Sequence, residues 1–344
     1  MMQTAARFAA LLMIFAPLGV QTGRAEEKPM MNAAVAHQYG GPEVLKFERV
    51  PRPDPNDDEA LVRVIASSVN PADPLTLNGR FAKAWGTHLP LIPGYDIAGV
   101  VEKTGPNIAK LKVGDAVYGY PTFGGGWADY VTVKEYEVAL KPKSLTFAQA
   151  ASVPLCALTA WQSLVSVAKL QPGQAVLIHG GSGGVGSFAV QIAKARGARV
   201  VATASTANQD VLKQLGVDVP IDYTKTKFED VAKDVDAVLD PIGKDTLARS
   251  YAVVKKGGIV MCLVALPEKA ELTKRGIHGA AISVHPDAGD LTQIAQLIDA
   301  GKIKPIVAQV LPLNEANAIA AEQQAETHHT RGKIVLQVAD EPKI

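Results

Sequence analysis

Five glycines in the segment 180–186 form the clearest chemical motif of the sequence. The segment follows an apolar run, Val176–His179, and precedes a segment whose apolar side chains recur at helical spacing. Gly181, Gly183 and Gly186 have the spacing of a turn that binds the pyrophosphate of a dinucleotide. Such a turn brings backbone N–H groups and the start of a helix to the phosphates. We therefore expect dinucleotide contacts from Gly180, Gly181, Ser182, Gly183, Gly184, Val185 and Gly186.

The same turn fits a second chemistry, because Gly180, Ser182 and Gly184 satisfy the G-x-S-x-G pattern of serine hydrolases. Asp287 and Asp290, and then His328 and His329, come later in the chain. This gives the order Ser, Asp, His of some hydrolase triads. A hydrolase does not need the last glycine of the turn, however, and the turn lies at the first strand of an alternating series. Dinucleotide binding is favoured, and a hydrolase using Ser182 is the alternative from another enzyme class.

The end of the next strand indicates which dinucleotide fits. In such folds an acidic residue after the second strand binds the ribose hydroxyls of NAD. Here Ser205 and Thr206 follow the strand 199–204, and Asp210 comes only at the start of the next helix, where an acid stabilises the helix. Small hydroxyl side chains leave room for a 2′-phosphate and can donate hydrogen bonds to it. The sequence therefore favours NADP(H).

The elements that position this turn fall into two regions. From Met31 to about Leu140, short apolar runs separated by Gly, Pro, Asn and Asp indicate the strands of a β barrel or sandwich. Thr146 and Gln149 fit a capping box at the start of a helical stretch. Beyond it, apolar strands alternate with helices, which predicts βαβ units and a parallel sheet. One of these helices is expected over 245–254, ended by Gly257 and Gly258, and the segment 280–284 is a candidate strand. The expected fold class is α/β with an additional β domain.

Composition and charge narrow the classes of function. The chain has 344 residues, of which 47% are hydrophobic, and this is enough for two domains. Its net charge is +1 with acids and bases mixed, so no nucleic-acid partner is expected. The two cysteines, Cys156 and Cys262, lie far apart and have no metal-binding spacing.

The N-terminal segment has the features of a secretory signal peptide. A basic residue precedes an apolar stretch, Phe8–Val20, and Gly23–Ala25 provides small residues for cleavage. The stretch is too short for a comfortable membrane span. We expect a signal peptide over residues 1–25, export to the periplasm, and no stable membrane span in the mature chain. The alternative is a cytoplasmic protein whose translation starts at Met30 or Met31.

Several segments of the chain, taken in their order along the sequence, together resemble the motifs of a known enzyme family. They are Ser68–Asp73, Pro93–Val101, Gly114–Gly119, His179–Gly186, Ile221–Tyr223, Val238–Gly243 and His329–Val335. Over nearly all of residues 31–338 the chain resembles the medium-chain dehydrogenase/reductase superfamily, in its zinc-independent quinone oxidoreductase (zeta-crystallin-like) branch. The resemblance implies a GroES-like β domain over 31–150, completed by 305–340, and a Rossmann NADP-binding domain over 151–304. The nicotinamide would lie in the cleft between the domains.

The resemblance also implies the catalytic residues, which are Asn70, Asp73 and Tyr95. Asn70 can donate a hydrogen bond to the acceptor's oxygen, and Tyr95 can donate or relay a proton. Asp73 could position either side chain or a water. Each of them could instead be structural, in a turn, as a cap or in packing. The tyrosine that some relatives carry shortly after this segment is absent, because the nearest aromatic residue is Phe81.

Further cofactor contacts are expected beyond the glycine turn. By resemblance, Thr159 lies near the nicotinamide and Ser205 and Tyr223 lie at the adenosine phosphate. Arg331 resembles a position close to the cofactor or to an interface. The last expected contacts are Gly243, Leu263 and Val264, which follow the ends of the next two strands. Such sheets bind ligands at these strand ends.

No metal site is expected. Zinc-dependent relatives have Gly-His-Glu where this chain has Gly94-Tyr95-Asp96, and the segment 70–73 contains no cysteine ligand. Two cysteines cannot form either zinc site of those relatives. Asp96 is then expected to be structural, and His328–His329 to be a polar loop.

The expected function is reduction of a quinone or an α,β-unsaturated carbonyl compound by NADPH, without zinc. Three alternatives stay open: an alcohol or aldehyde dehydrogenase of the same superfamily, the Ser182 hydrolase, and a non-catalytic NADPH-binding protein. The expected partner is a small-molecule acceptor, and the resemblance is compatible with a homodimer.

Overall fold

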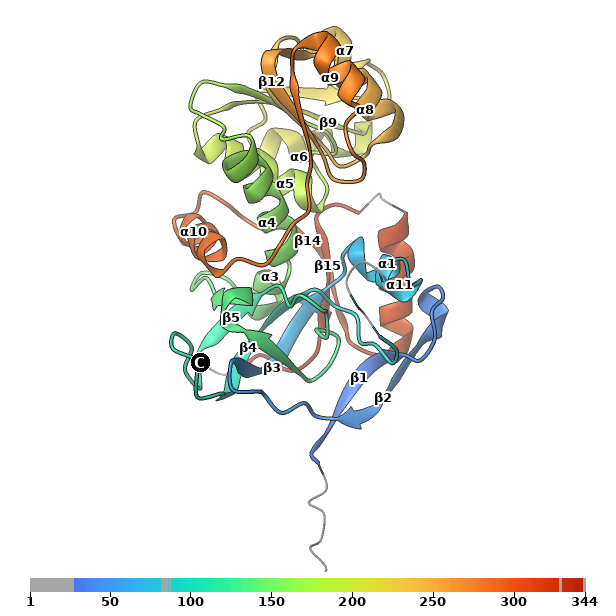
Figure 1. The fold of residues 1–344 in the computed structure, drawn as a ribbon, viewed down its shortest axis with the longest axis vertical. Coiled ribbons are helices and arrows are strands. Elements are labelled where there is room, and N and C mark those ends of the chain that lie inside the picture. The colour runs from blue at the N-terminus through green and yellow to red at the C-terminus, as the bar shows by residue number, and fades with distance from the viewer. Residues whose placement is uncertain (1–27, 82–85, 87, 328–329, 343–344) are drawn as a thin grey trace, which may run out of the picture.

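The computed structural model describes residues 28–81, 86, 88–327 and 330–342. The expected signal peptide and the pair His328–His329 lie outside the described residues. The described chain forms a six-stranded, a seven-stranded and a two-stranded sheet. In Figure 1 the six-stranded sheet lies in the upper lobe and the other two lie in the lower lobe.

Parallel strands form the six-stranded sheet, as the alternating pattern predicts. They are β8 (Ala175–Ile178), β9 (Arg199–Ala204), β10 (Val219–Asp222), β11 (Val235–Asp240), β12 (Val254–Cys262) and β13 (His278–Ala281). Their order is β10-β9-β8-β11-β12-β13. The chain runs outward from β8 to β10 and returns to β11 on the other side of β8. A ligand crevice is therefore expected where the carboxyl ends of β8 and β11 diverge.

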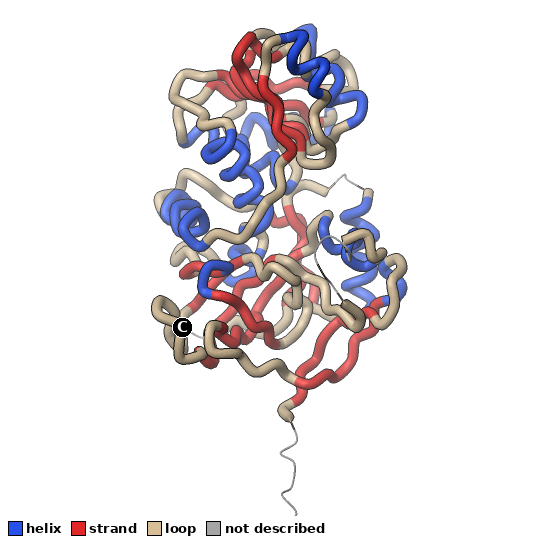
Figure 2. Tube along the Cα trace, in the orientation of Figure 1, coloured by secondary structure: helices blue, strands red, loops and turns tan. Residues whose placement is uncertain are grey.

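Helices flank this sheet (Figure 2). They are α5 (Gly184–Ala195), α6 (Gln209–Gln214), α7 (Phe228–Val231), α8 (Lys244–Ser250) and α9 (Lys269–Arg275). The first of them, α5, buries an apolar face against β8 and β9. This packing fixes the glycine turn that links β8 to α5.

The seven-stranded sheet combines strands from both ends of the described chain. It contains β3 (Glu59–Ser68), β4 (Asp96–Thr104), β5 (Ala116–Gly119), β6 (Tyr130–Lys134), β7 (Val138–Leu140), β14 (Val307–Pro312) and β15 (Lys333–Gln337). The antiparallel pairing of β15 with β3 brings the end of the chain beside residues 66–68. A separate hairpin pairs β1 (Met30–Ala36) with β2 (Leu45–Pro51). Two helices, α1 (Ala72–Leu77) and α11 (Glu315–Glu326), lie in the same lobe.

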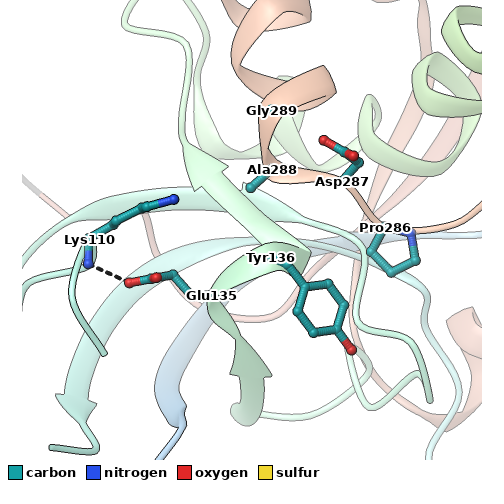
Figure 3. Close-up of a pocket in the computed structure, with 7 residues that line it drawn as sticks. All are labelled: Lys110, Glu135, Tyr136, Pro286, Asp287, Ala288 and Gly289. Carbon is teal, nitrogen blue, oxygen red and sulfur yellow. Dashed lines mark hydrogen bonds between the residues drawn. The ribbon is translucent and has the colours of Figure 1, made fainter. Parts of the chain in front are cut away.

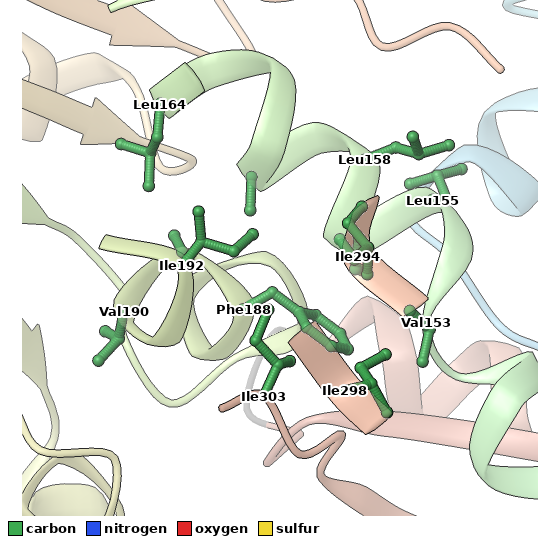
Figure 4. Close-up of a cluster of buried hydrophobic side chains, with 14 of the residues drawn as sticks. Val153, Leu155, Leu158, Leu164, Phe188, Val190, Ile192, Ile294, Ile298 and Ile303 are labelled. Atoms are coloured by element: carbon green, nitrogen blue, oxygen red, sulfur yellow. The ribbon is translucent and has the colours of Figure 1, made fainter. Parts of the chain in front are cut away.

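A shared hydrophobic cluster joins the two lobes. It includes side chains of α3 (Phe147–Ala151), α4 (Pro154–Trp161), α5 and α10 (Ala288–Asp299), together with Ile65 of β3 and Val335 of β15. Figure 4 shows the side chains of α4, α5 and α10 facing one another in this cluster. The capping box at the start of α3 is confirmed, because Thr146 accepts a hydrogen bond from the Gln149 amide and Gln149 accepts one in return. Continuous burial of apolar surface across the lobes opposes their separation.

Two expectations about elements were wrong in detail. The helix expected over 245–254 ends at Ser250, and β12 already begins at Val254. Gly257, with φ of +79°, lies inside β12 where its pairing with β11 changes register, so it permits a bulge and ends no helix. The possible strand near 280–284 is β13, which spans His278–Ala281. No helix in the described part of the chain is long and apolar enough to span a membrane.

Candidate functional site

The glycine turn has the geometry of a phosphate-binding turn. Gly180 has φ of +63°, which favours glycine. A Cβ on Gly186 would lie 2.1 Å from the Gly180 carbonyl oxygen, so only glycine fits where the helix meets the strand. A Cβ on Gly183 would lie 3.4 Å from the same oxygen, which is ordinary contact. The need for glycine at Gly183 therefore does not come from packing within the protein.

The start of α5 can receive an anion. Gly183 is the N-cap residue in an extended conformation, and no side chain caps the helix. The helix has no acidic residue in its first turn. Its first backbone N–H groups and the positive end of its dipole are thus free of competing carboxylates among the described residues. These features fit the pyrophosphate of a dinucleotide.

The lobe that contains the seven-stranded sheet contacts this turn. The Gly332 amide donates to the Ser182 carbonyl oxygen at 3.1 Å, and Gly183 pairs with Gly332 in a parallel bridge. A Cβ on Gly184 would lie 2.9 Å from Cys156 Sγ and 3.3 Å from Lys333 Cδ. The turn therefore packs directly on buried Cys156 of α4 and on buried Lys333 at the start of β15.

A buried ion pair lies beneath the turn. Lys333 Nζ donates to the Val69 carbonyl oxygen at 2.6 Å, to Asp96 Oδ2 at 3.2 Å, and to Asn70 Oδ1. Asp96 also accepts hydrogen bonds from the Ser68 hydroxyl, the Leu155 backbone N–H and the side-chain amide of Asn70. Burial lowers the pKa of Lys333, but the neighbouring Cys156 and Asp96 raise it, and the net direction is upward. The ammonium ion is therefore retained, and it fixes the amide of Asn70 together with Asp96.

Asp73 and Tyr95 lie next to this pair. The carboxylate of Asp73 accepts hydrogen bonds from the backbone N–H groups of Asn70 and Gly94, each at 2.8 Å. Burial raises the pKa of Asp73 to about 7 despite these hydrogen bonds. The Tyr95 hydroxyl lies 2.6 Å from Thr76 Oγ1, and burial raises the pKa of Tyr95. Tyr95 is thus a neutral hydroxyl at physiological pH.

The structure brings the three expected catalytic residues together, and all three are fully buried. Their partners Lys333 and Thr76 were not predicted from the sequence. No local pattern marks Lys333, because its role depends on the pairing of β15 with β3. Asp96 was expected to be structural, and its four hydrogen-bond donors agree with that expectation.

Ser205 and Tyr223, which are expected at the adenosine phosphate, directly follow the neighbouring strands β9 and β10, and Arg331, expected near the cofactor or an interface, reaches the loop after β9. Arg331 donates to the Ala207 carbonyl oxygen and Asn208 Oδ1, and lies 3.4 Å from Asp210. Ser205 Oγ accepts a hydrogen bond from Asn208, and the side chain of Tyr223 is exposed. Arg331 thus reaches from the segment before β15 to the edge of the parallel sheet.

The remaining expected contacts lie after the ends of β11 and β12 and on α4. Gly243 has φ of +74°, and a Cβ there would lie 2.6 Å from Val264 Cγ2, so the loops after β11 and β12 touch. Leu263 donates its amide to the Asp240 carbonyl oxygen. Thr159 is buried and donates its hydroxyl to the Leu155 carbonyl oxygen at 2.7 Å, which leaves it an acceptor for a ligand.

A surface cavity of about 370 Å³ lies elsewhere, between the segment after β6 and the start of α10 (Figure 3). None of the expected site residues lines it. Asp287 lines it and caps α10, with Oδ1 accepting the Asp290 amide at 2.8 Å, so this acid is used structurally. Among the described residues, no three His, Cys, Asp or Glu side chains are grouped to hold a metal ion.

Comparison with known proteins places the chain among redox enzymes. Residues 56–143 match the model of the alcohol dehydrogenase GroES-like domain, and residues 215–336 match that of a zinc-binding dehydrogenase. The chain is 38% identical over 318 residues to the chloroplastic NADPH-dependent alkenal/one oxidoreductase of Arabidopsis thaliana, covering 89% of this chain and 79% of that protein. It is 31% identical over 330 residues to the quinone oxidoreductase of Sus scrofa, covering 89% and 98%.

A solved structure supports the same assignment. The quinone oxidoreductase of Coxiella burnetii superposes with a TM-score of 0.83 at 32% identity, covering 90% of this chain and 100% of that one. Sequence and fold therefore agree over both lobes. The chain belongs to the medium-chain dehydrogenase/reductase superfamily, in its quinone oxidoreductase branch.

Proposed function

We propose that this protein is an NADPH-dependent oxidoreductase that reduces a quinone or an α,β-unsaturated carbonyl compound without zinc. One observation carries the proposal: the turn after β8 has a glycine, Gly183, that packing within the protein does not require. A pyrophosphate that approaches the backbone closely would require it. Relatives that are named NADPH-dependent alkenal/one oxidoreductase and quinone oxidoreductase indicate the class of acceptor.

In this proposal the expected contact residues bind the dinucleotide along its length. The turn 180–186 would bind the pyrophosphate through backbone N–H groups. Arg331 would turn from Ala207 and Asn208 to the 2′-phosphate, because a phosphate is a stronger partner for a guanidinium than a neutral carbonyl. When bound, the nicotinamide supplies a hydride to the electron-poor carbon of the acceptor.

Hydrogen-bond donors replace the metal in this proposal. The side chain of Asn70 is fully buried in this structure and donates one amide N–H to Asp96. On the basis of the resemblance, we assign its second N–H to the developing negative charge on the oxygen of an acceptor, which requires the site to open around Asn70. Lys333 holds the amide in that orientation by donating to its oxygen. Tyr95 and Thr76 form a neutral hydroxyl pair that can pass a proton. The residue types at 70 and 95 are poor zinc ligands, which supports metal-free chemistry.

A screen with the purified protein tests the proposal. We expect NADPH to be oxidised by 9,10-phenanthrenequinone or by a 2-enone, with NADH a poorer donor and a chelator such as EDTA without effect. A primary alcohol with NADP⁺ should give no reaction. Activity that EDTA abolishes and zinc restores would contradict the metal-free mechanism, and ester cleavage lost in Ser182→Ala would indicate the hydrolase instead.

Cellular location and assembly are further parts of the proposal. We propose that residues 1–25 direct export, as the sequence predicts, and that the mature chain forms a homodimer, with which the resemblance is compatible. The N-terminal mass of the cellular protein tests export, because a chain that starts at Met30 or Met31 would contradict it. Light scattering tests the dimer.

A further inference from the structure

His179 is a buried polar residue at the start of the glycine turn, and the proposed function does not yet use it. It directly follows β8, and its ring packs edge-on against Phe228, with 4.6 Å between the ring centroids. Nδ1 lies 3.2 Å from Thr203 Oγ1 of β9, and Nε2 lies 2.9 Å from Ser250 Oγ of α8. Both of these partners are buried as well. The imidazole therefore connects three elements around the expected dinucleotide site.

The directions of these hydrogen bonds follow from the hydroxyl of Ser250. Its one proton is donated to the Thr246 carbonyl oxygen at 2.7 Å, so its oxygen accepts a proton from His179 Nε2. Burial, together with the positive charge of Arg249, lowers the pKa of His179 to about 3, so the ring is neutral and Nδ1 is an acceptor. Thr203 therefore donates its hydroxyl proton to Nδ1.

Thr203 in turn holds the first amides of the glycine turn. Its hydroxyl oxygen accepts the Gly180 N–H at 3.2 Å, and its carbonyl oxygen accepts the Gly181 N–H at 2.9 Å. The Gly180 carbonyl oxygen accepts the Gly183 N–H at 3.0 Å. The backbone N–H groups of these three glycines are thus used within the protein. A phosphate must bind to other N–H groups of the turn and of the first turn of α5.

We propose that His179 is a positioning residue for the dinucleotide: it orients the Thr203 hydroxyl, and Thr203 fixes the turn so that the start of α5 faces the pyrophosphate. The hydrogen bonds form one directed chain from the turn to Ser250. Ser250 lies on α8, the helix that begins directly after Gly243, another expected cofactor contact. A turn that is fixed before the ligand arrives binds it more tightly, because little ordering is left for the binding step. The inference rests on the proposed function and deepens it.

The tautomer of His179 tests the direction of the chain. In the cofactor-free protein at pH 7, nitrogen-15 NMR of the histidine side chains should show His179 as the neutral tautomer that is protonated at Nε2. The variant His179→Phe assigns the signal, because phenylalanine has a ring of similar shape without nitrogen. If this variant does not fold, His179→Gln assigns it. A ring protonated at Nδ1 alone, or at both nitrogens, overturns the proposal.

Thr203→Val tests whether the chain serves binding, because valine has the shape of threonine without its hydroxyl. We expect NADPH affinity to fall at least about tenfold, with KM for NADPH raised and kcat at saturating NADPH nearly unchanged. Thr203→Ser keeps the hydroxyl and should restore the affinity. The control Thr273→Val, which removes a hydroxyl bonded to a backbone carbonyl on exposed α9, should bind NADPH like the wild type. Unchanged affinity in Thr203→Val, or an equal loss in Thr203→Ser, overturns the proposal.

A double variant tests whether His179 acts through Thr203. We expect His179→Phe to weaken NADPH binding, and the double variant with Thr203→Val to bind no more weakly than Thr203→Val alone. Losses that add in the double variant overturn the positioning role. If either single variant does not fold, Ser250→Ala removes the acceptor at the other end of the chain and should also weaken NADPH binding. Unchanged affinity in Ser250→Ala then overturns the proposal.

These measurements separate the inference from the proposed function. A wild-type protein that does not bind NADPH contradicts the proposed function. A wild-type protein that binds and oxidises NADPH, while Thr203→Val binds it equally well, contradicts only the positioning role of His179.

Discussion

Lys333 is the residue whose contacts hold the site together. Its ammonium group binds Asp96 and Asn70, although 237 residues separate it from Asp96 in the chain. We expect Lys333→Met to destabilise the protein by about 3–5 kcal/mol, because Asp96 would remain buried without its partner. Urea unfolding measures this loss.

A surface ion pair provides the control for this substitution. Lys194 pairs with Asp218 at 2.7 Å, but both side chains are partly exposed. Lys194→Met should therefore change the free energy of unfolding very little. If Lys194→Met and Lys333→Met destabilised the protein equally, the buried pair would not have the role described above.

Two glycines of the turn allow folding and binding to be separated. Gly186→Ala places a Cβ 2.1 Å from a backbone oxygen, so we expect a loss of stability of about 1–3 kcal/mol or more. Gly183→Ala has room in the free protein and should keep its stability. It should nevertheless lose at least about tenfold in NADPH affinity, or 1.4 kcal/mol, because the new methyl group meets the pyrophosphate. Thermal unfolding and quenching of NADPH fluorescence measure the two effects, and unchanged affinity in Gly183→Ala would count against the turn.

At the scale of elements, the packing of α11 against α1 predicts how stability depends on pH. The pKa of Asp73 is raised to about 7 and that of Glu322 to about 10, so the folded state binds more protons than the unfolded state. The stability that these groups contribute is complete below their ordinary pKa values. It is lost as pH rises through the folded values, from about pH 4 to 7 for Asp73 and up to about pH 10 for Glu322.

We therefore expect the free energy of unfolding to fall between pH 7 and pH 9, with Glu322 contributing up to about 1.4 kcal/mol per pH unit. Glu322→Gln should flatten this dependence, because the variant has no proton to lose there. Urea unfolding at several pH values measures the slope. Equal slopes in the wild type and Glu322→Gln would show that Glu322 is not the titrating group.

The elements also show what the sequence could predict. Alternating apolar segments were enough to predict the parallel sheet, and Thr146 with Gln149 was enough to predict the start of α3. By contrast, α11 has a buried face of two alanines and a glutamate, which gives no apolar stripe to recognise. The end of α8 was misplaced because Gly257 indicated a helix end but lies in a β-bulge.

At the scale of the whole molecule, contacts between distant segments are what the sequence could not predict. The glycine turn is a local motif, so its residues could be named from the sequence. The resemblance to relatives supplied Asn70, Asp73 and Tyr95 by position. Lys333 could not be found in this way, because it acts on Asp96 and Asn70, which only the tertiary packing brings to it.

Arg331 links the two lobes, and its position predicts a preference for NADPH over NADH. It reaches from the segment before β15 to Ala207 and Asn208 beside the expected 2′-phosphate site. We expect Arg331→Ala to weaken NADPH binding by about 10- to 100-fold, because a charge-assisted hydrogen bond to phosphate is lost. NADH binding should change little, since NADH lacks that phosphate. Fluorescence titration with both nucleotides measures this difference, and an equal loss for both would indicate a general effect on the fold.

The most direct test of the account is the fate of deuterium from NADPH labelled at C4 of the nicotinamide. The 4R- and 4S-labelled forms are each incubated with the protein and a 2-enone, and the product is analysed by mass spectrometry and NMR. We expect one of the two forms to deliver its deuterium to the β-carbon of the enone. A reduced product without deuterium from either form, or no reduction of any enone or quinone while NADPH is bound, would contradict it.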